Sequence, residues 1–335
     1  MNVRSLIVIL VLVTSINALS QSNQVPDNIE FHVLKDLFDS LGGPSWTNKN
    51  NWPTAGNWPP AATSVQFATW YGVTVTNGDI TSINLSNNNL QGQLPFRVGN
   101  LATLTTLQLD VNRIKGPIPS SIGNLHALRM LNLSYNNFSG TLPDFFDNMR
   151  DLRDLRLTNT QVSGSLPSSI GFPGSKLYRL LMNNNKFNGP IPSTWNNLRA
   201  LMDLELAFNE LTGELPSFIG NWTSLSILDI RNNKFTGAIP SSIGNLTLLG
   251  GMNISNNRFS GDFPSSISTS GVYYIIASNN YFVSLPASLL SRPALTTVYF
   301  DNNDLVSVPD FGSYSNRANL ALKIENNRLD LSQLE

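Results

Sequence analysis

A period of about 24 residues runs through most of the chain and constrains its fold more than any other feature. An apolar template begins eleven times, with successive starts 24 residues apart except for one spacing of 25 and two of 23. The starts are Ile80, Leu104, Leu128, Leu152, Leu177, Leu201, Leu225, Leu249, Val272, Leu295 and, in a less regular form, Asn319. A fixed period over so many copies predicts a solenoid, in which each repeat packs only against its neighbours.

The first half of each repeat predicts a short strand. Leu107 and Leu109 are two residues apart, so both point to the same side of a strand and the residues between them point to the other. Stacked repeats place Leu107 against Leu131 and Leu109 against Leu133. We therefore predict one continuous core and a parallel sheet along the concave face of the solenoid.

In most repeats an asparagine lies three positions after the second core leucine, as Asn112 does after Leu109. At the point where the chain turns off its strand, an amide side chain can satisfy backbone groups of its own turn and of the neighbouring one. Thr160 takes this place in the fourth repeat and is predicted to be a weak point. The asparagines are Asn88, Asn112, Asn136, Asn185, Asn209, Asn233, Asn257, Asn280, Asn303 and Asn327.

The second half of each repeat is predicted to form the convex side. Gly116 permits a tight backbone path. Ile118-Pro119 is predicted to start a second extended segment that is short and irregular, because proline cannot donate to a ladder. Ile122 and Leu125 then return to the core. Residues 171–175 add one position here and are predicted to be a tolerated loop.

Residues 1–20 have the pattern of a secretory signal peptide. Arg4 supplies the positive end, residues 6–13 are an unbroken apolar run, and Ala18 and Ser20 are small residues at a plausible cleavage site. The apolar run is shorter than the roughly 20 residues that span a bilayer. We therefore expect a secreted, extracellular mature chain without a membrane span.

The charge balance argues against two classes of partner. Charged residues make up 13% of the chain, and the net charge is −1. Such a balance gives no electrostatic basis for binding nucleic acid or an anionic membrane surface. The chain has no cysteine. A long solenoid core does not need the disulfides on which small extracellular domains depend.

Residues 21–79 carry no repeat and are predicted to form an N-terminal cap. Asp27 and Glu30 have the spacing of a capping box, and apolar residues at helical spacing follow until Gly42-Gly43. Residues 70–74 are predicted to be the strand that closes the cap. Four tryptophans follow the predicted helix. We predict that they cover the open end of the core, in preference to the alternative that they form a sugar-binding platform. These tryptophans are Trp46, Trp52, Trp58 and Trp70.

Two segments resemble a known family. Residues 80–264, through the repeated Asn-x-Leu/Phe-x-Gly-x-Ile/Leu-Pro, resemble the plant-type leucine-rich repeats of receptor ectodomains and polygalacturonase-inhibitor-like proteins. Residues 37–46 are similar to the caps of protist, slime-mould and bacterial members. Plant members normally close both caps with paired cysteines, which this chain lacks.

The resemblance implies a right-handed superhelix that binds partners on its concave face. The predicted fold is thus α/β, a right-handed leucine-rich-repeat solenoid with a concave parallel β-sheet. Its convex side would consist of short extended segments and 3-10 or helical turns. Residues 80–335 would hold eleven repeats, the last of them incomplete. We predict a monomer that binds a protein, a peptide or a glycan.

The outward positions of the predicted strands gather charge and aromatic rings on one face. Because the chain is poor in charge, this clustering predicts a recognition surface, and Arg and Tyr are favoured anchor residues. Solvated ion pairs between neighbouring strands are the alternative. The predicted ligand-binding residues are Arg129, Arg153, Asp154, Arg156, Arg179, Asp203, Glu205, Asp229, Arg231, Tyr273, Tyr274 and Tyr299.

Two further binding functions remain open. A secreted inhibitor of a cell-wall-degrading glycosidase would use the same concave face. Binding to ice or to a cell-wall polymer would need a flat array repeated across many copies, and the turn column that starts at Asn87 is the closest candidate. Val111, Tyr135 and Phe208 interrupt this column. The geometry of the strand-to-turn corner also explains its asparagines without any such ligand.

Enzyme chemistry is not predicted. Glu205 and Asp229 share a column at a spacing of about 4.8 Å, close to the roughly 5–5.5 Å between the carboxyl groups of retaining glycosidases. Both are expected to be exposed on an open face, where neither pKa would be raised. His32 and His126 have no metal-ligand or acid–serine arrangement beside them. We therefore predict a non-enzymatic protein that uses no metal and no cofactor.

Six N-glycosylation sequons are candidates for modification. Because Asn-Leu-Ser arises easily inside the repeat itself, we expect about half of them to be used. Those at Asn84, Asn132 and Asn253 are predicted to point to the concave side. The six are Asn84, Asn132, Asn137, Asn221, Asn245 and Asn253.

Overall fold

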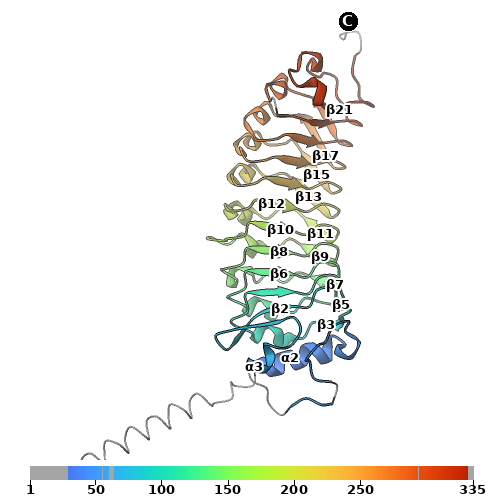
Figure 1. Cartoon of the computed structure of the whole chain (residues 1–335). Coiled ribbons are helices and arrows are strands. Elements are labelled where there is room, and N and C mark those ends of the chain that lie inside the picture. Colours follow the sequence, from blue (N-terminus) through green and yellow to red (C-terminus); the bar gives the residue numbers. More distant parts are fainter. Residues whose placement is uncertain (1–28, 55, 60–63, 293, 331–335) are drawn as a thin grey trace, which may run out of the picture.

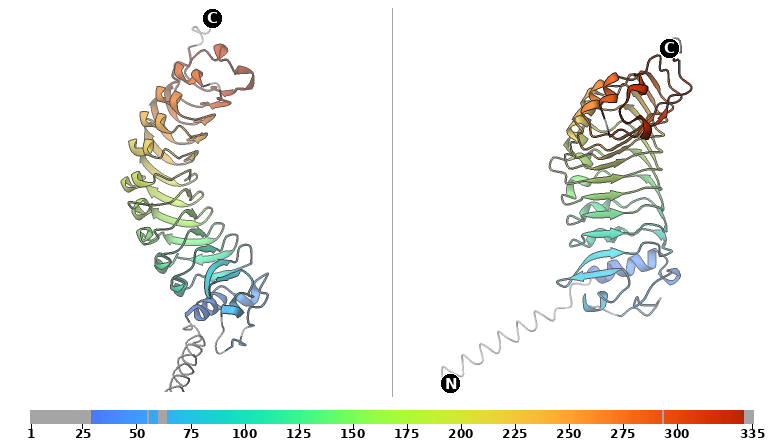
Figure 2. Two further views of the ribbon diagram at one scale, coloured as in Figure 1. Left: turned by 60° about the vertical axis from the view of Figure 1, so that its left-hand side comes forward. Right: turned by 45° about the horizontal axis from the view of Figure 1, so that its top comes forward.

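The computed structural model describes residues 29–54, 56–59, 64–292 and 294–330. These residues form a curved stack of repeats with a helical cap at one end (Figures 1 and 2). The predicted signal peptide at residues 1–20 and Asp27 of the predicted capping box lie outside the described residues. Within the described part of the chain, no helix is both long and apolar enough to cross a membrane.

One parallel sheet runs along the whole stack and confirms the predicted concave sheet. Leu107 pairs with Leu131, and Leu131 with Leu155, so equivalent residues of successive repeats lie side by side. Among the strands of the described residues, only the first two, β1 and β2, pair in an antiparallel manner. The order is β1 (Val73–Thr76), β2 (Asp79–Asn84), β4 (Thr106–Gln108), β6 (Met130–Asn132), β8 (Asp154–Arg156), β10 (Arg179–Leu181), β12 (Asp203–Glu205), β14 (Ile227–Asp229), β16 (Gly251–Asn253), β18 (Tyr274–Ile276), β20 (Thr297–Tyr299) and β21 (Ala321–Lys323).

A second parallel sheet, which was not predicted from the sequence, covers one side of the stack. The segment at Ile118-Pro119 lies outside this sheet and is short and irregular, as predicted. In the second repeat the strand ends at Gly116, where φ is 81°, and Pro119 follows it, so proline never interrupts the ladder. The strands are β3 (Gln91–Gln93), β5 (Arg113–Gly116), β7 (Asn137–Thr141), β9 (Gln161–Ser165), β11 (Lys186–Gly189), β13 (Glu210–Glu214), β15 (Lys234–Gly237), β17 (Arg258–Asp262) and β19 (Tyr281–Ser284).

Short 3-10 helices form the outer, convex side of the stack, as predicted (Figure 2). Ile122 and Leu125 are fully buried and join the core from this side. The helices are η2 (Phe96–Asn100), η3 (Ser120–Asn124), η4 (Phe146–Asn148), η5 (Ser168–Gly171), η6 (Ser193–Asn197), η7 (Ser217–Asn221), η8 (Ser241–Asn245), η9 (Ser265–Thr269), η10 (Ala287–Ser291), η11 (Phe311–Ser313) and η12 (Arg317–Asn319).

The recurring asparagines form a buried ladder between the two sheets. The side-chain amide of Asn136 donates to the carbonyls of Leu109 and Leu133, and its Oδ1 accepts the N–H of Ile114 at 3.0 Å. One side chain therefore satisfies its own turn and the preceding repeat, as predicted. Thr160 has only a hydroxyl for this task, which hydrogen bonds to Oδ1 of Asn185.

The N-terminal cap consists of the helices α2 (Ile29–Ser40), η1 (Gly43–Ser45) and α3 (Ser64–Phe67). Glu30 accepts the backbone N–H of Ile80 at 2.8 Å and so ties α2 to β2, a contact that the capping-box prediction did not anticipate. The closing strand begins at Val73 rather than at Trp70, because Gly72 is left-handed with φ 78° and forms a turn before it.

The cap tryptophans cover the end of the core, and the platform alternative was wrong. Trp46, Trp52 and Trp70 are at most 5% exposed. Trp46 and Trp52 meet edge to face with their ring centroids 4.9 Å apart, and Trp58 packs partly buried against the same cluster. A sugar would need an exposed ring face, which these three buried side chains do not offer.

Candidate functional site

The concave sheet presents one side chain per repeat in a straight column. Arg156, Leu181, Glu205 and Asp229 are consecutive partners in the sheet register, which confirms the predicted column that contains Glu205 and Asp229. Their neighbours two positions earlier, such as Asp154 and its partners, form a parallel column on the same face. Strand pairing therefore brings together residues that are 24 or 25 positions apart in the sequence.

A row of charges crosses the middle of this face. The Asp154 side chain is 2% exposed and accepts from Nε and Nη2 of Arg156, at 2.9 and 2.8 Å. Arg179 reaches the same carboxylate at 3.3 Å and extends to Asp203 at 3.4 Å. Two half-exposed guanidinium groups are thus held in fixed positions above one buried acid.

The acidic part of the face is half-buried, and the expectation of full exposure for Glu205 and Asp229 was wrong. Only 16% of the Asp229 side chain is exposed, and Arg231 lies 3.6 Å from it. Glu205 accepts a hydrogen bond from Nδ2 of Asn183. Residues that follow the concave strands therefore cover both carboxylates, Asn183 from the preceding repeat and Arg231 from the same repeat as Asp229.

Burial changes the acidity of two of these groups. It raises the pKa of the Asp203 carboxyl above its ordinary value, the charge of Glu205 raises it further, and Arg179 opposes both. Burial also raises the pKa of Asp229, against the opposing charge of Arg231. Each carboxylate is therefore less stable in its charged form here than in water.

The raised pKa of Asp203 predicts a particular pH dependence. The folded chain holds a proton that the unfolded chain releases, so this group lowers stability as pH rises from its ordinary pKa of 3.8 through the raised folded value. We expect Asp203→Asn to raise the denaturant midpoint at neutral pH. The difference from the wild type should vanish well below pH 3.8, where Asp203 is protonated in both the folded and the unfolded chain. A variant less stable than the wild type at neutral pH would contradict this.

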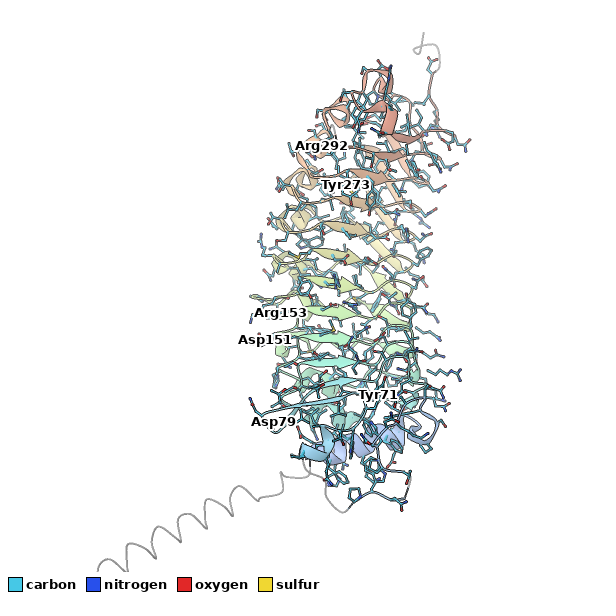
Figure 3. All side chains as sticks on the ribbon, viewed as in Figure 1. Tyr71, Asp79, Asp151, Arg153, Tyr273 and Arg292 are labelled. Carbon is cyan, nitrogen blue, oxygen red and sulfur yellow. The ribbon has the colours of Figure 1, made fainter. Side chains whose placement is uncertain are left out.

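The other predicted ligand-binding residues flank the charged row. Arg153 lies at one edge of the stack beside Asp151, as Figure 3 shows, and like Arg129 it is exposed. Tyr273 and Tyr274 meet with ring centroids 5.4 Å apart, and Lys323 lies 4.5 Å from the Tyr299 ring centroid. The aromatic patch therefore continues the same face toward the C-terminal repeats.

The sequons differ in accessibility. Asn132 and Asn253 are 6% and 7% exposed, and each Oδ1 accepts the N–H of the residue two positions later. Both side chains would have to leave these hydrogen bonds in order to carry a glycan. Asn221 is half-buried and donates to Asn196. The exposed sequon asparagines are Asn84, Asn137 and Asn245.

A hollow of about 360 Å³ lies beside the charged row, with Arg156, Glu205 and Tyr135 among its lining residues. Its volume falls in the range of ligand sites. Tyr135 and its neighbour Val111 stand in the turn column, where sequence reasoning treated them only as interruptions. The sequence could have pointed to Val111 and Tyr135, because they are apolar at a position that asparagine holds in eight of the eleven repeats.

These apolar turn residues have an unfavourable backbone conformation. Val111, Tyr135 and Phe208 have φ of 55–56°. This left-handed region costs an L-residue about 1–2 kcal/mol, and a β-branched or bulky residue is rarely found there. All three are also exposed, by 45–52%. The same φ in the asparagine repeats confirms that corner geometry explains the asparagine column.

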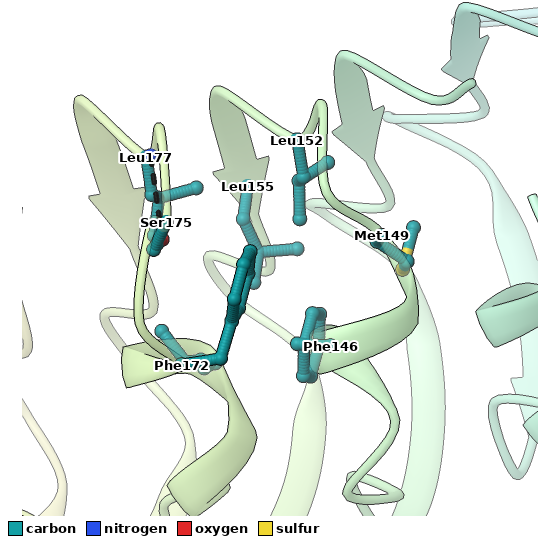
Figure 4. A pocket seen from close by; sticks show the side chains of 8 residues that line it. Phe146, Met149, Leu152, Leu155, Phe172, Ser175 and Leu177 are labelled. Carbon is teal, nitrogen blue, oxygen red and sulfur yellow. Dashed lines mark hydrogen bonds between the residues drawn. The ribbon is translucent and has the colours of Figure 1, made fainter. Parts of the chain in front are cut away.

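A second cavity, on the convex side, is too small to be a site. It lies among Phe146, Met149, Phe172 and Leu177, next to the one-residue insertion (Figure 4). Its volume is about 10 Å³, which is at the limit for one water molecule. Among the described residues, no group of three His, Asp or Glu side chains has the arrangement of a metal site.

Profiles described as leucine-rich repeat match the chain at residues 79–101, 102–162 and 224–246. The matched segments coincide with the stacked units of the fold. The repeats of this chain are leucine-rich repeats. No curated protein matches this leucine-rich-repeat chain in sequence.

Solved structures with the same fold include two plant receptors. The ectodomain of the membrane receptor kinase GASSHO1/SCHENGEN3 from Arabidopsis thaliana, in complex with CASPARIAN STRIP INTEGRITY FACTOR 2, is 29% identical with a TM-score of 0.76. The match covers 78% of the present chain and 32% of that one. The plant peptide hormone receptor RGFR1, in complex with RGF2, is 27% identical with a TM-score of 0.56, covering 71% and 46%. The leucine-rich-repeat protein thus spans less than half the length of either receptor chain.

A plant ice-binding protein also has this fold. It is 24% identical with a TM-score of 0.70, and the match covers 92% of the present chain and 96% of that one. At this level of identity the likeness concerns the fold alone. The leucine-rich-repeat architecture is therefore shared by proteins with different ligands.

Proposed function

We propose that this chain is an extracellular, non-enzymatic binding protein that recognises a protein or peptide segment on its concave face. The observation that carries the proposal is the charged row, in which buried Asp154 fixes the guanidinium groups of Arg156 and Arg179. Pre-positioned arginines lose little freedom on binding, so they are effective anchors. The adjoining hollow and the tyrosine patch extend the surface along the stack.

The likeness to ligand-bound receptor ectodomains supports this proposal. The plant peptide hormone receptor RGFR1 shares the repeat fold at 27% identity. Twelve strands at about 4.8 Å spacing give the concave sheet a length of roughly 50 Å, which is enough for a standard protein interface. The pattern of residues 1–20 supports secretion.

The geometry favours recognition over catalysis. Glu205 and Asp229 lie side by side in the sheet register, as the two carboxyl groups of a retaining glycosidase would have to. Asn183 and Arg231, however, already engage them. A glycosidase acid must be free to exchange its proton with a bound sugar. An inhibitor of a glycosidase would dock as a protein on the same face and is one form of the proposed function.

A charge reversal on the concave face tests the proposal. We expect Glu205→Lys to weaken binding of peptides selected from a random-sequence library by at least about tenfold, since an anchor contact is commonly worth 1.4 kcal/mol or more. Glu214→Lys is the matched control, because Glu214 is exposed in the same repeat but lies on the second sheet. Equal affinity of both variants and the wild type would refute concave binding, and failure to select any peptide would refute the proposed ligand class.

A further inference from the structure

The turn after each concave strand has the same left-handed conformation, whatever residue occupies it. At eleven such positions φ lies between 49° and 59°, and eight of the residues are asparagine. The backbone N–H of Val111 donates to Ser134, and that of Tyr135 donates to Thr158, so the ladder between repeats fixes the corner. Val111 and Tyr135 are therefore kept in a conformation that suits asparagine better.

These two side chains form an exposed apolar ridge. Val111 is 47% exposed and Tyr135 is 52% exposed, and they occupy equivalent corners of adjacent repeats. Both line the concave hollow of about 360 Å³, and both also line a second hollow of about 420 Å³ on the other side. Neither exposure nor backbone strain benefits the folded chain. Strained residues of this kind cluster at functional sites. Of the three strained apolar residues at these corners, Val111 and Tyr135 line the two hollows and Phe208 lines neither.

The charges of the concave hollow complement a cation. Arg156 lines it, but Asp154 already pairs with that guanidinium. Asp110 and Glu205 also line it, and they accept hydrogen bonds from Ser86 and Asn183. Among the described residues, neither carboxylate has an ion-pair partner. The hollow therefore offers two uncompensated acids beside the aromatic ring of Tyr135, which is a favourable surface for a cation.

We infer that the Val111–Tyr135 ridge binds an extended peptide segment in which a basic residue adjoins an apolar one. The basic side chain enters the concave hollow beside Tyr135 and Glu205, and the apolar side chain packs over Val111. The inference rests on the proposed function and names the class of peptide. Two hollows with a ridge between them suit an extended chain, whose successive side chains point to opposite sides.

The test uses a random-sequence peptide library displayed on phage and selected on the immobilised protein. We expect the selected peptides to share an Arg or Lys next to an aliphatic or aromatic residue. Their affinity should fall at least tenfold in the variant Tyr135→Asn and several-fold in Val111→Asn. Because asparagine suits the corner, both variants should unfold at the same or a higher denaturant concentration than the wild type.

Phe208→Asn is the matched control. Phe208 is an exposed apolar residue at the same corner, with φ 56°, but it does not line the concave hollow and lies instead against Arg231. This variant should lose the same backbone strain as the ridge variants and should keep its affinity for the selected peptides. A loss of affinity confined to the ridge variants, without loss of stability, therefore identifies a contact and not a folding defect.

Three outcomes would overturn the inference. If the selected peptides bind Tyr135→Asn as tightly as the wild type, the ridge is not part of the binding site. The proposal of binding on the concave face would still stand. Enrichment of acidic peptides would contradict the charge argument. Failure to select any peptide, together with Tyr135-dependent binding to a panel of neutral oligosaccharides, would replace the peptide with a glycan and would refute the proposed function as well.

Discussion

Replacing Asn209 with alanine is expected to lower the free energy of unfolding by about 3 kcal/mol or more. The side chain is 7% exposed, donates to the carbonyls of Met182 and Leu206 at 3.0 Å, and accepts the N–H of Phe187 at 3.0 Å. Alanine leaves these buried backbone groups without partners, at about 1–3 kcal/mol for each group. The loss should appear as a lower denaturant midpoint.

Thr160→Ala is the control for this prediction. Thr160 occupies the same position in the ladder and is equally buried, but it contributes a single hydroxyl, bound to Asn185. Its removal should cost about 1 kcal/mol. If both variants shift the midpoint equally, the ladder asparagine does not have the role that its hydrogen bonds indicate.

The register of the concave face could be predicted because it follows from the repeat period alone. Leu107 must lie beside Leu131 if each repeat adds one strand, and the residues between the core leucines then align as Arg156, Leu181 and Glu205 do. The asparagine ladder was predictable for the same reason. A polar residue that recurs at every corner has a backbone group to satisfy there.

The environment of each side chain could not be predicted from the period. Asp154 and Asp203 hold equivalent positions, but their side chains are 2% and 16% exposed, because two arginines cover the first. Asn132 is an apparent concave sequon, but its amide turns toward its own backbone and is buried. These differences depend on rotamers and on the neighbouring repeats, which a one-dimensional pattern does not contain.

The second sheet was absent from the sequence-based prediction, which considered only the segment that begins at Ile118-Pro119. Proline disfavours a ladder only at the position it occupies, and Pro119 lies after the strand β5 has ended at Gly116. The strand itself, Arg113–Gly116, has polar and apolar residues in alternation. That alternation, with Ile114 buried between two exposed residues, was the available signal.

The junction between the cap and the first repeat should be sensitive to a single methyl group. Gly92 has φ 120°, and a Cβ there would lie 2.0 Å from the carbonyl oxygen of Ser40, the last residue of α2. Gln91 donates its N–H to Leu41 at 3.0 Å, so β3 cannot move away without losing this bond. Gly92→Ala is therefore expected to cost about 3 kcal/mol or more, from the clash and the forbidden φ together.

Gly189→Ala separates these two causes. Gly189 also has positive φ, 75°, but no atom lies within 4 Å of its Cβ position, so only the backbone term of about 1 kcal/mol applies. In Gly92→Ala the fluorescence of the cap tryptophans, which include Trp46 and Trp52, should change at lower denaturant than the signal of the repeats. Displacement of α2 exposes the open end of the core first, because each unit of a solenoid is stabilised only by its neighbours. Equal midpoints for the two alanine variants would show that the close approach of α2 and β3 does not hold the cap in place.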